Sequence, residues 1–291
     1  MNQLARCDLH CHSTESDGTL TPRQLVELAR DLNLRSLSLT DHDTIAGVEE
    51  AKKAGEELGV RVLSGVEISV EYAGKTVHML GYCFDAGAAK LQEELERLVR
   101  GRNERNVKIV QRLNELGLAV TLEEVEAEAG GKVVGRPHIA RVLLRHGYVQ
   151  TWEEAFDKYL ARGAAAYFER LRFTPHDAVA LIREAGGVAV LAHPKYVALH
   201  EGETLDDIVQ SLVQAGLEGI ECYYTEHTPE ETAQYIELAK RYNLVITGGS
   251  DFHGDVKPEI SLGSGTGALF IPDECADALV ERARRHESKC G

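Results

Sequence analysis

Nine histidine and carboxylate side chains lie at or just beyond the ends of apolar runs, and all are residue types that bind divalent metal ions. His10 and His12 are two residues apart, so a strand places both rings on one face. Asp251 and His253 repeat this spacing. Imidazole and carboxylate ligands without thiolates suit Mn, Fe, Zn or Co. The sequence therefore predicts a metal-dependent hydrolase whose ligands are His10, His12, Asp17, His42, Glu67, His78, His193, Asp251 and His253.

Each of these residues also has an ordinary structural interpretation when taken alone. His78 and His193 have apolar neighbours, where a single histidine is more often a hydrogen-bonded core residue. Asp43 or Thr44 could cap the helix expected after them. Glu67 follows a buried run, where an unpaired carboxylate would be costly. The metal interpretation is favoured for the whole set because barrels gather their active sites at C-terminal strand ends, where we expect every one of these residues.

The segments that must position these residues alternate between strand and helix. Strands are expected to end near His12, Thr40, Glu67, Gly81, Ala192, Cys222 and Thr247. Repeated strand and helix units predict parallel strands with right-handed crossovers, and hence an α/β sheet or barrel. The helices expected around these strands span residues 22–33, 44–58, 175–185, 205–215 and 229–242.

The fourth and fifth strands are separated by about a hundred residues, far more than a crossover needs. The pattern there is wholly helical, with helices expected at 87–116, 121–129, 137–145 and 151–160. We expect a barrel domain formed by residues 1–86 and 173–291. Residues 87–172 are then an inserted helical subdomain over the active-site mouth, acting as a lid or substrate platform.

The charge of the chain is uneven. The formal net charge is −15, which argues against unspecific adhesion to nucleic acid. The segment from Arg97 to Arg172 contains 14 basic and 10 acidic residues, a net charge of +4, which leaves a net charge of −19 for the rest of the chain. A basic insert could hold a phosphorylated substrate. For one run we favour instead the solvated face of a long helix: Arg97, Arg100, Arg102, Arg105, Lys108 and Arg112.

The sequence also indicates where the protein works. No apolar stretch approaches the roughly 20 residues that a membrane span needs. Six cysteines include no Cys-x-x-Cys pair, which favours reduced thiols. We expect a cytoplasmic protein without membrane association and without a stable protein partner.

Six segments together resemble one known family, the polymerase and histidinol phosphatase (PHP) family. They are Asp8-Leu9-His10-Cys11-His12-Ser13, Ser16-Asp17-Gly18, Thr40-Asp41-His42-Asp43, Gly65-Val66-Glu67, His193-Pro194 and Ser250-Asp251-Phe252-His253. The resemblance implies a distorted, TIM-like barrel of seven β/α units and a centre of three divalent ions. It implies that Glu67 joins two sites, with His10, His12 and Asp251 on the first and His78 and His193 on the second. The third site would take Asp17, His42 and His253.

These ligands suit the hydrolysis of phosphoesters. Metal-bound hydroxide is the expected nucleophile, and the bridging carboxylate of Glu67 is the expected link between ions. Manganese is the expected metal, with iron, zinc or cobalt as alternatives. We expect Asp41 and Asp43 to orient the ring of His42 without binding metal themselves.

Three further side chains are expected to bind the substrate phosphate. Arg136 directly precedes a helix, where its guanidinium and free amides can face an anion. The resemblance implies phosphate contacts for Arg136 and His227, whereas Lys195 is inferred only from its place after His193-Pro194. Aromatic residues could stack on a base, but we expect core packing for Tyr167, Phe168, Tyr223 and Tyr224.

The insert, Gly135-Arg136-Pro137-His138 and the segment from Tyr224 to Thr228 resemble one branch of the family, the small bacterial PHP phosphoesterases. This branch includes nucleoside 3′,5′-bisphosphate phosphatases and a 5′-to-3′ exoribonuclease. We therefore expect removal of the 3′ phosphate from 3′-phosphoadenosine 5′-phosphate (pAp), or stepwise release of mononucleotides from short 5′-phosphorylated RNA. The alternatives are a histidinol phosphatase or other small-molecule phosphatase, a non-catalytic PHP module, and an amidohydrolase.

Overall fold

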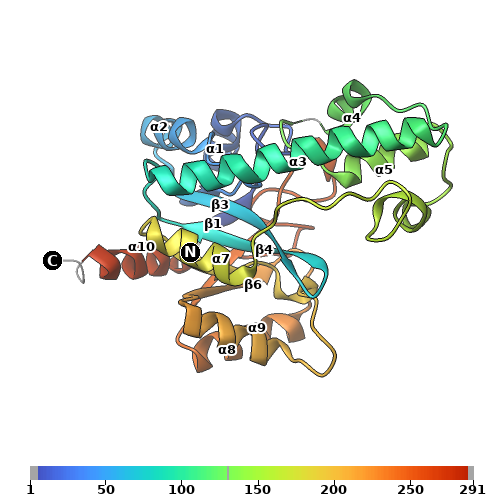
Figure 1. Ribbon diagram of the computed structural model, residues 1–291. Coiled ribbons are helices and arrows are strands. Elements are labelled where there is room, and N and C mark those ends of the chain that lie inside the picture. Colours follow the sequence, from blue (N-terminus) through green and yellow to red (C-terminus); the bar gives the residue numbers. More distant parts are fainter. Residues whose placement is uncertain (1–5, 130, 288–291) are drawn as a thin grey trace.

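The computed structural model describes residues 6–129 and 131–287, and its strands form one seven-stranded sheet surrounded by helices (Figure 1). The strands are β1 (Cys7–Cys11), β2 (Ser36–Leu39), β3 (Arg61–Tyr72), β4 (Lys75–Tyr82), β5 (Val188–Leu191), β6 (Gly219–Tyr224) and β7 (Val245–Gly249). The helices are α1 (Pro22–Asp31), α2 (Val48–Leu58), α3 (Ala89–Glu115), α4 (Leu122–Ala129), α5 (Arg136–Arg145), α6 (Trp152–Ala155), α7 (Pro175–Glu184), α8 (Leu205–Ala215), α9 (Pro229–Arg241) and α10 (Glu274–Glu287). Short turns of other helix types are η1 (Phe156–Leu160), η2 (Pro194–Tyr196) and η3 (Gly254–Val256).

The strands follow one another in the sheet in chain order, from β1 to β7. The two ends of the sheet meet at the candidate site, where Asp251 N donates to His10 O at 2.8 Å and His12 N donates to Phe252 O at 2.9 Å. Gly249 permits this approach, since a Cβ at that position would overlap His10. The sheet is thus a nearly closed barrel, and the expected fold class is confirmed.

One strand contradicts the expectation of parallel strands throughout. β4 is antiparallel to both β3 and β5. Tyr72 pairs with Lys75 across a turn at Ala73 and Gly74, whose φ angles are 47° and 75°. A two-residue hairpin leaves no room for a crossover helix, so the paired strands must run in opposite directions. His78 lies in the middle of this strand, not at its C-terminal end.

Threonine caps fix the starts of four barrel helices. Thr21, Thr174, Thr204 and Thr228 each accept a hydrogen bond from the third residue of the helix, whose side chain bonds back to the cap. The helix expected from Thr44 begins only at Val48 and has no side-chain cap. The sequence analysis did not predict α10, which packs against β1, β5 and β7.

Residues of the expected insert form a hydrophobic cluster of their own. The first half of α3 contributes Leu91, Leu95 and Leu98 to the barrel core. Its second half packs with α4 and α5 in a lobe at one side of the barrel (Figure 1). The buried side chains there include Ile109, Leu113, Val125, Ile139, Leu143 and Leu160.

The polar face of α3 is only partly solvated, which corrects the interpretation favoured from the sequence. Arg97 and Arg100 are exposed, as expected. Arg102 and Arg105, however, are only 6% and 5% exposed. They turn toward the barrel, where Asp43 accepts a hydrogen bond from Arg102, while the Arg105 guanidinium donates to Asn106 beside it on α3.

Candidate metal centre

Glu67 lies at the middle of the predicted ligands. It stands inside β3 and is 1% exposed. Its Oε2 atom lies 3.0 Å from His42 Nδ1 and 3.3 Å from Nε2 of both His10 and His12. One carboxylate oxygen therefore faces imidazoles from two separate segments of the chain.

The other oxygen of Glu67 faces two further histidines. Oε1 lies 2.8 Å from His78 Nδ1 and 3.1 Å from His193 Nε2. These two ring nitrogens are 3.3 Å apart. The antiparallel course of β4 thus brings His78 to the same carboxylate as the histidine after β5.

Asp251 adds a second carboxylate at the junction of β7 and β1. Its Oδ1 atom lies 3.2 Å from His12 Nε2 and 3.6 Å from His10 Nε2. Its Oδ2 atom accepts from Lys257 Nζ at 2.7 Å and from the Tyr224 hydroxyl at 3.0 Å. Asp251 therefore faces the histidines with one oxygen and the pocket-lining residues with the other.

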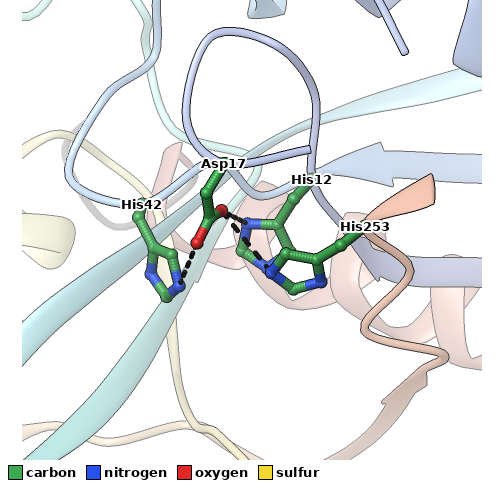
Figure 2. A group of neighbouring side chains, drawn as sticks. All are labelled: His12, Asp17, His42 and His253. Atoms are coloured by element: carbon green, nitrogen blue, oxygen red, sulfur yellow. Dashed lines mark ion pairs between the residues drawn. The ribbon is translucent and has the colours of Figure 1, made fainter. Parts of the chain in front are cut away.

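A third carboxylate, Asp17, lies among three imidazoles (Figure 2). Oδ1 is 3.6 Å from His12 Nδ1 and 3.5 Å from His253 Nε2. Oδ2 points to the other side, 3.8 Å from His42 Nε2. All nine predicted ligands are thus brought together.

The side chains fit a metal centre because their buried polar atoms lack partners. Nε2 of His10 and His12, Nδ1 of His42, Oε2 of Glu67 and Oδ1 of Asp17 form no hydrogen bond in the described part of the chain. Buried polar atoms normally have hydrogen-bond partners, so these unpaired atoms need an explanation. Bound cations would supply one. Three groups have ligand atoms within 4.8 Å of one another: His12, Asp17, His42 and His253; His10, His12 and Glu67; His42, Glu67 and His78. These groups share members, so the division into three separate sites stays a prediction.

The electrostatics prepare the carboxylates as anionic ligands. Burial alone would raise the pKa of Glu67, but the imidazoles of His78, His42 and His10 outweigh it and hold that pKa well below the ordinary value. The pKa of Asp17 is also lowered well below its ordinary value, against burial, by His42 and His253. Burial lowers the pKa of His42 to about 3. At neutral pH this ring is neutral, the form that binds metal.

Glu221, in β6, is a functional candidate that the sequence analysis missed. Its carboxylate is fully buried and lies 2.9 Å from His10 Nδ1. The same carboxylate accepts from His193 N at 2.8 Å, where His193 has a φ of 21°. By holding Nδ1 of His10, Glu221 directs Nε2 toward Glu67. The argument applied to Glu67, a carboxylate within an apolar run, could have found it.

Asp41 and Asp43 bind elsewhere than predicted. Asp41 accepts from Ser13 N, Ser13 Oγ and Ser16 Oγ at 2.8, 2.7 and 2.5 Å, and so shapes the loop that carries Asp17. Asp43 accepts from Ser69 N at 2.6 Å and from Arg102. Neither carboxylate bonds to the His42 ring within residues 6–129 and 131–287, and Asp43 caps no helix.

Of the three residues predicted to bind the substrate phosphate, Arg136 lines the pocket and the other two do not. Arg136 lines the same pocket as the metal ligands, with its guanidinium 5.9 Å from the Phe156 ring centre and 5.8 Å from that of Tyr167. Lys195 Nζ instead donates to Glu226 O at 2.8 Å. His227 Nδ1 lies 2.9 Å from Cys222 O. Neither Lys195 nor His227 lines that pocket, and their contacts with substrate stay predictions.

The comparison with known families shows which family the chain belongs to. Residues 8–169 match the model of the PHP domain. The chain belongs to the PHP domain family. The crystal structure of a protein from Bifidobacterium adolescentis, described as a metal-dependent phosphoesterase, is 33% identical to this chain. It aligns with a TM-score of 0.81 over 96% of both chains.

Curated relatives of this PHP chain include three enzymes of phosphoester hydrolysis. A 5′-3′ exoribonuclease of Haemophilus influenzae is 35% identical over 84% of this chain and 89% of the relative. A phosphoribosyl 1,2-cyclic phosphate 1,2-diphosphodiesterase of Eggerthella lenta is 35% identical, with shares of 85% and 94%. A 3′,5′-nucleoside bisphosphate phosphatase of Chromobacterium violaceum is 34% identical, with shares of 86% and 88%. The predicted class, a metal-dependent phosphoric ester hydrolase, is confirmed.

Proposed function

We propose that this PHP protein hydrolyses the 3′ phosphoester of 5′-phosphorylated nucleotides, with pAp and short 5′-phosphorylated RNA as substrates. The observation that carries the proposal is a pocket of about 550 Å³ that is lined both by seven of the nine predicted metal ligands and by a group of arginines. We call this group the arginine wall: Arg102, Arg105, Arg136, Arg141, Arg170 and Arg172.

The arginine wall has more donors than the protein itself satisfies. Nε of Arg105 and Arg172, and both Nε and Nη1 of Arg170, are buried without a hydrogen-bond acceptor among the described residues. Burial and the like charges of Arg170, Arg136 and Arg102 lower the pKa of Arg105. A buried donor without an acceptor is unfavourable, and phosphate oxygens match the guanidinium fork. The wall is therefore suited to a phosphate group that is distinct from the one at the metal centre.

A metal centre and a group of arginines in one pocket favour a substrate with two phosphate groups. The 5′ phosphate would bind the arginine wall while the 3′ phosphoester lies over Glu67 and its histidines. Histidinol phosphate fits less well, because it carries one phosphate and a cationic amine that the arginines repel. The names of the Haemophilus and Chromobacterium relatives support the same substrate class.

We propose three divalent ions per chain, with manganese as the metal. The nine ligands would hold them, with Glu67 between the first and second ions. When bound, such ions supply Lewis acidity that activates water and offsets charge on the phosphoryl oxygens. The protein contributes the rest: Glu221 fixes the ring of His10, and Asp41 fixes the loop that carries Asp17.

We also propose that residues 87–172 are a subdomain inserted into the barrel formed by 1–86 and 173–291. All six arginines of the arginine wall belong to this insert. The insert would thus supply substrate binding, and the barrel would supply the metal centre. Arg136 is proposed to bind the 5′ phosphate, with Lys195 and His227 as further phosphate contacts.

The cytoplasm stays the proposed location. Five cysteines, Cys7, Cys11, Cys83, Cys222 and Cys275, have free thiols, which suits a reducing compartment. None of the helices in the described part of the chain combines the length and apolar character that a membrane span requires.

The experiment that tests this function compares substrates on the manganese-loaded protein. The panel is pAp, a short 5′-phosphorylated RNA, phosphoribosyl 1,2-cyclic phosphate and histidinol phosphate, with Glu67→Ala as the control variant. We expect turnover of pAp or the RNA, lost in the control. Turnover of the cyclic phosphate alone, or of histidinol phosphate alone, would contradict the proposed substrate, and so would no turnover at all by protein shown to contain metal.

A further inference from the structure

The pocket is also lined by residues that belong neither to the arginine wall nor to the metal ligands. The arginine wall rests on the β2 and β3 side, where Arg102 bonds to Asp43 and Ser69 and Arg172 bonds to Glu71. Four of the other lining residues come from the segments that follow β5, β6 and β7. We call these four the tyrosine wall: Tyr196, Glu226, Val256 and Lys257.

Tyr196 presents an aromatic face beside the metal ligands. It ends the turn η2, which directly follows His193, and the two ring centres are 5.7 Å apart with an edge-to-face geometry. The residue is 45% exposed although it is a large aromatic side chain. Its hydroxyl donates to the Glu226 carboxylate, so the ring is held in one orientation. A rigid, exposed ring at this place is suited to stacking.

The tyrosine wall carries one cation in place of a guanidinium cluster. Lys257, just after η3, bonds to Oδ2 of Asp251 with its ammonium group and lines the pocket. Its neighbour Val256 adds an apolar surface. This combination of ring, apolar surface and single charge differs from the arginine wall and matches a nucleoside next to one phosphate.

Tyr196 is the aromatic residue best placed for this contact. Tyr224 is only 5% exposed and its hydroxyl bonds to Asp251. Tyr167 and Phe156 lie beside the guanidinium of Arg136, on the side of the arginine wall. Tyr223 does not line the pocket.

We propose that the tyrosine wall is a binding subsite for the nucleoside on the far side of the scissile phosphate, with its base stacked on Tyr196. The inference rests on the proposed function and deepens it, because pAp has no such nucleoside whereas an oligonucleotide does. In pApA, the 5′-phosphorylated dinucleotide of adenosine, the oxygen of water bonds to phosphorus and the bond between phosphorus and the 3′ oxygen breaks. That oxygen takes a proton, and the phosphate stays on the second nucleoside. One water thus converts pApA into two molecules of adenosine 5′-phosphate.

The test is the ratio of kcat/KM for pApA to kcat/KM for pAp, measured on the metal-loaded protein. Base stacking on one ring predicts that Tyr196→Ala and Tyr196→Leu lower this ratio about tenfold. Tyr196→Phe keeps the ring and loses only the hydroxyl that bonds to Glu226, so it should keep the ratio. An unchanged ratio in both Ala and Leu variants overturns the inference, as does an equal fall in Tyr196→Phe. Absence of turnover of both pAp and pApA by the wild type would refute the proposed function instead.

A binding measurement on the metal-free protein gives an answer that does not depend on turnover. The probe is pApA with 2-aminopurine as the second base, whose fluorescence falls when it stacks. We expect quenching by the wild type and Tyr196→Phe, and much weaker quenching by Tyr196→Leu at saturating protein. Equal quenching by Tyr196→Leu would contradict stacking on this ring.

Discussion

Asp43 accepts a charge-assisted hydrogen bond from Arg102, and both side chains are buried. Asp43 directly follows the predicted ligand His42 and has a φ of 56°, a conformation that non-glycine residues seldom adopt. Arg102 belongs to α3, the first helix of the proposed insert, and also donates to Ser69 Oγ at 3.2 Å. This pair therefore joins the arginine wall to the segments that carry His42 and Glu67.

The first prediction concerns this pair. Asp43→Asn leaves the Arg102 guanidinium buried without its counter-charge, beside other arginines. We expect a loss of stability on the order of 3 kcal/mol, measured by urea unfolding. Arg100→Ala, two residues before Arg102 on α3, removes an exposed partner of Glu96 and should change stability by less than about 0.5 kcal/mol. Similar losses of stability in the two variants would show that the buried pair stabilises the protein no more than the exposed one.

The second prediction concerns the orientation of a ligand by Glu221. Glu221→Gln keeps the shape of the side chain but weakens its hold on His10 Nδ1. Metal affinity should fall by about 10- to 100-fold, measured by competition with a chelating dye. Glu218→Gln is the matched control, because Glu218 faces Arg282 and His286 instead. An unchanged metal affinity in Glu221→Gln would contradict the prediction that Glu221 orients His10.

The third prediction separates substrate binding from metal binding. Arg105→Met and Arg170→Met remove charged donors from the arginine wall, so KM for pAp should rise about 10- to 100-fold while metal content stays constant. KM for p-nitrophenyl phosphate, which has no second phosphate, should change little. Arg112→Met, on the exposed part of α3, serves as the control. Loss of metal from the Arg105 or Arg170 variant would contradict this division of roles.

The fourth prediction concerns the proton that a metal ion must displace from His12. Burial alone would lower the pKa of His12, but the carboxylates of Asp251 and Glu67 outweigh it and raise the pKa to about 10. Metal must displace this proton, so loading at pH 7 should release protons and metal affinity should rise with pH toward about 10. In metal-free protein, the same group contributes stability that is full below pH 6.5 and is lost as pH rises toward 10. Calorimetry of metal binding in two buffers of different ionisation enthalpy measures the release, and identical heats in both would refute it.

The proximity of the nine candidate ligands and the strand count could be predicted from the sequence because both depend on local pattern. The spacing of His10 and His12 fixes a shared face, and apolar runs mark strands. The direction of β4 was predicted wrongly, since the short turn at Ala73 and Gly74 was not recognised as a hairpin. His78 still reaches Glu67, because alternation along a strand is the same in either direction.

The residues that support the ligands were harder to predict. Glu221 and the buried Arg102 acquire their roles from partners far away in the chain, namely His10 and Asp43. A run of arginines on a helix has the same pattern whether it faces solvent or a pocket. Tyr196 was missed for a similar reason, since its exposure beside His193 depends on the turn η2.

The central claim is that Glu67 joins the ligands of a metal centre that hydrolyses a 3′ phosphoester. The most direct test measures metal content per chain and phosphate release from pAp for wild type and Glu67→Gln, after removal of metal and reloading with manganese. The account predicts that wild type regains both metal and phosphate release, whereas Glu67→Gln binds less metal and releases no measurable phosphate. Phosphate release by Glu67→Gln at the wild-type rate, or by wild type freed of metal, would contradict it.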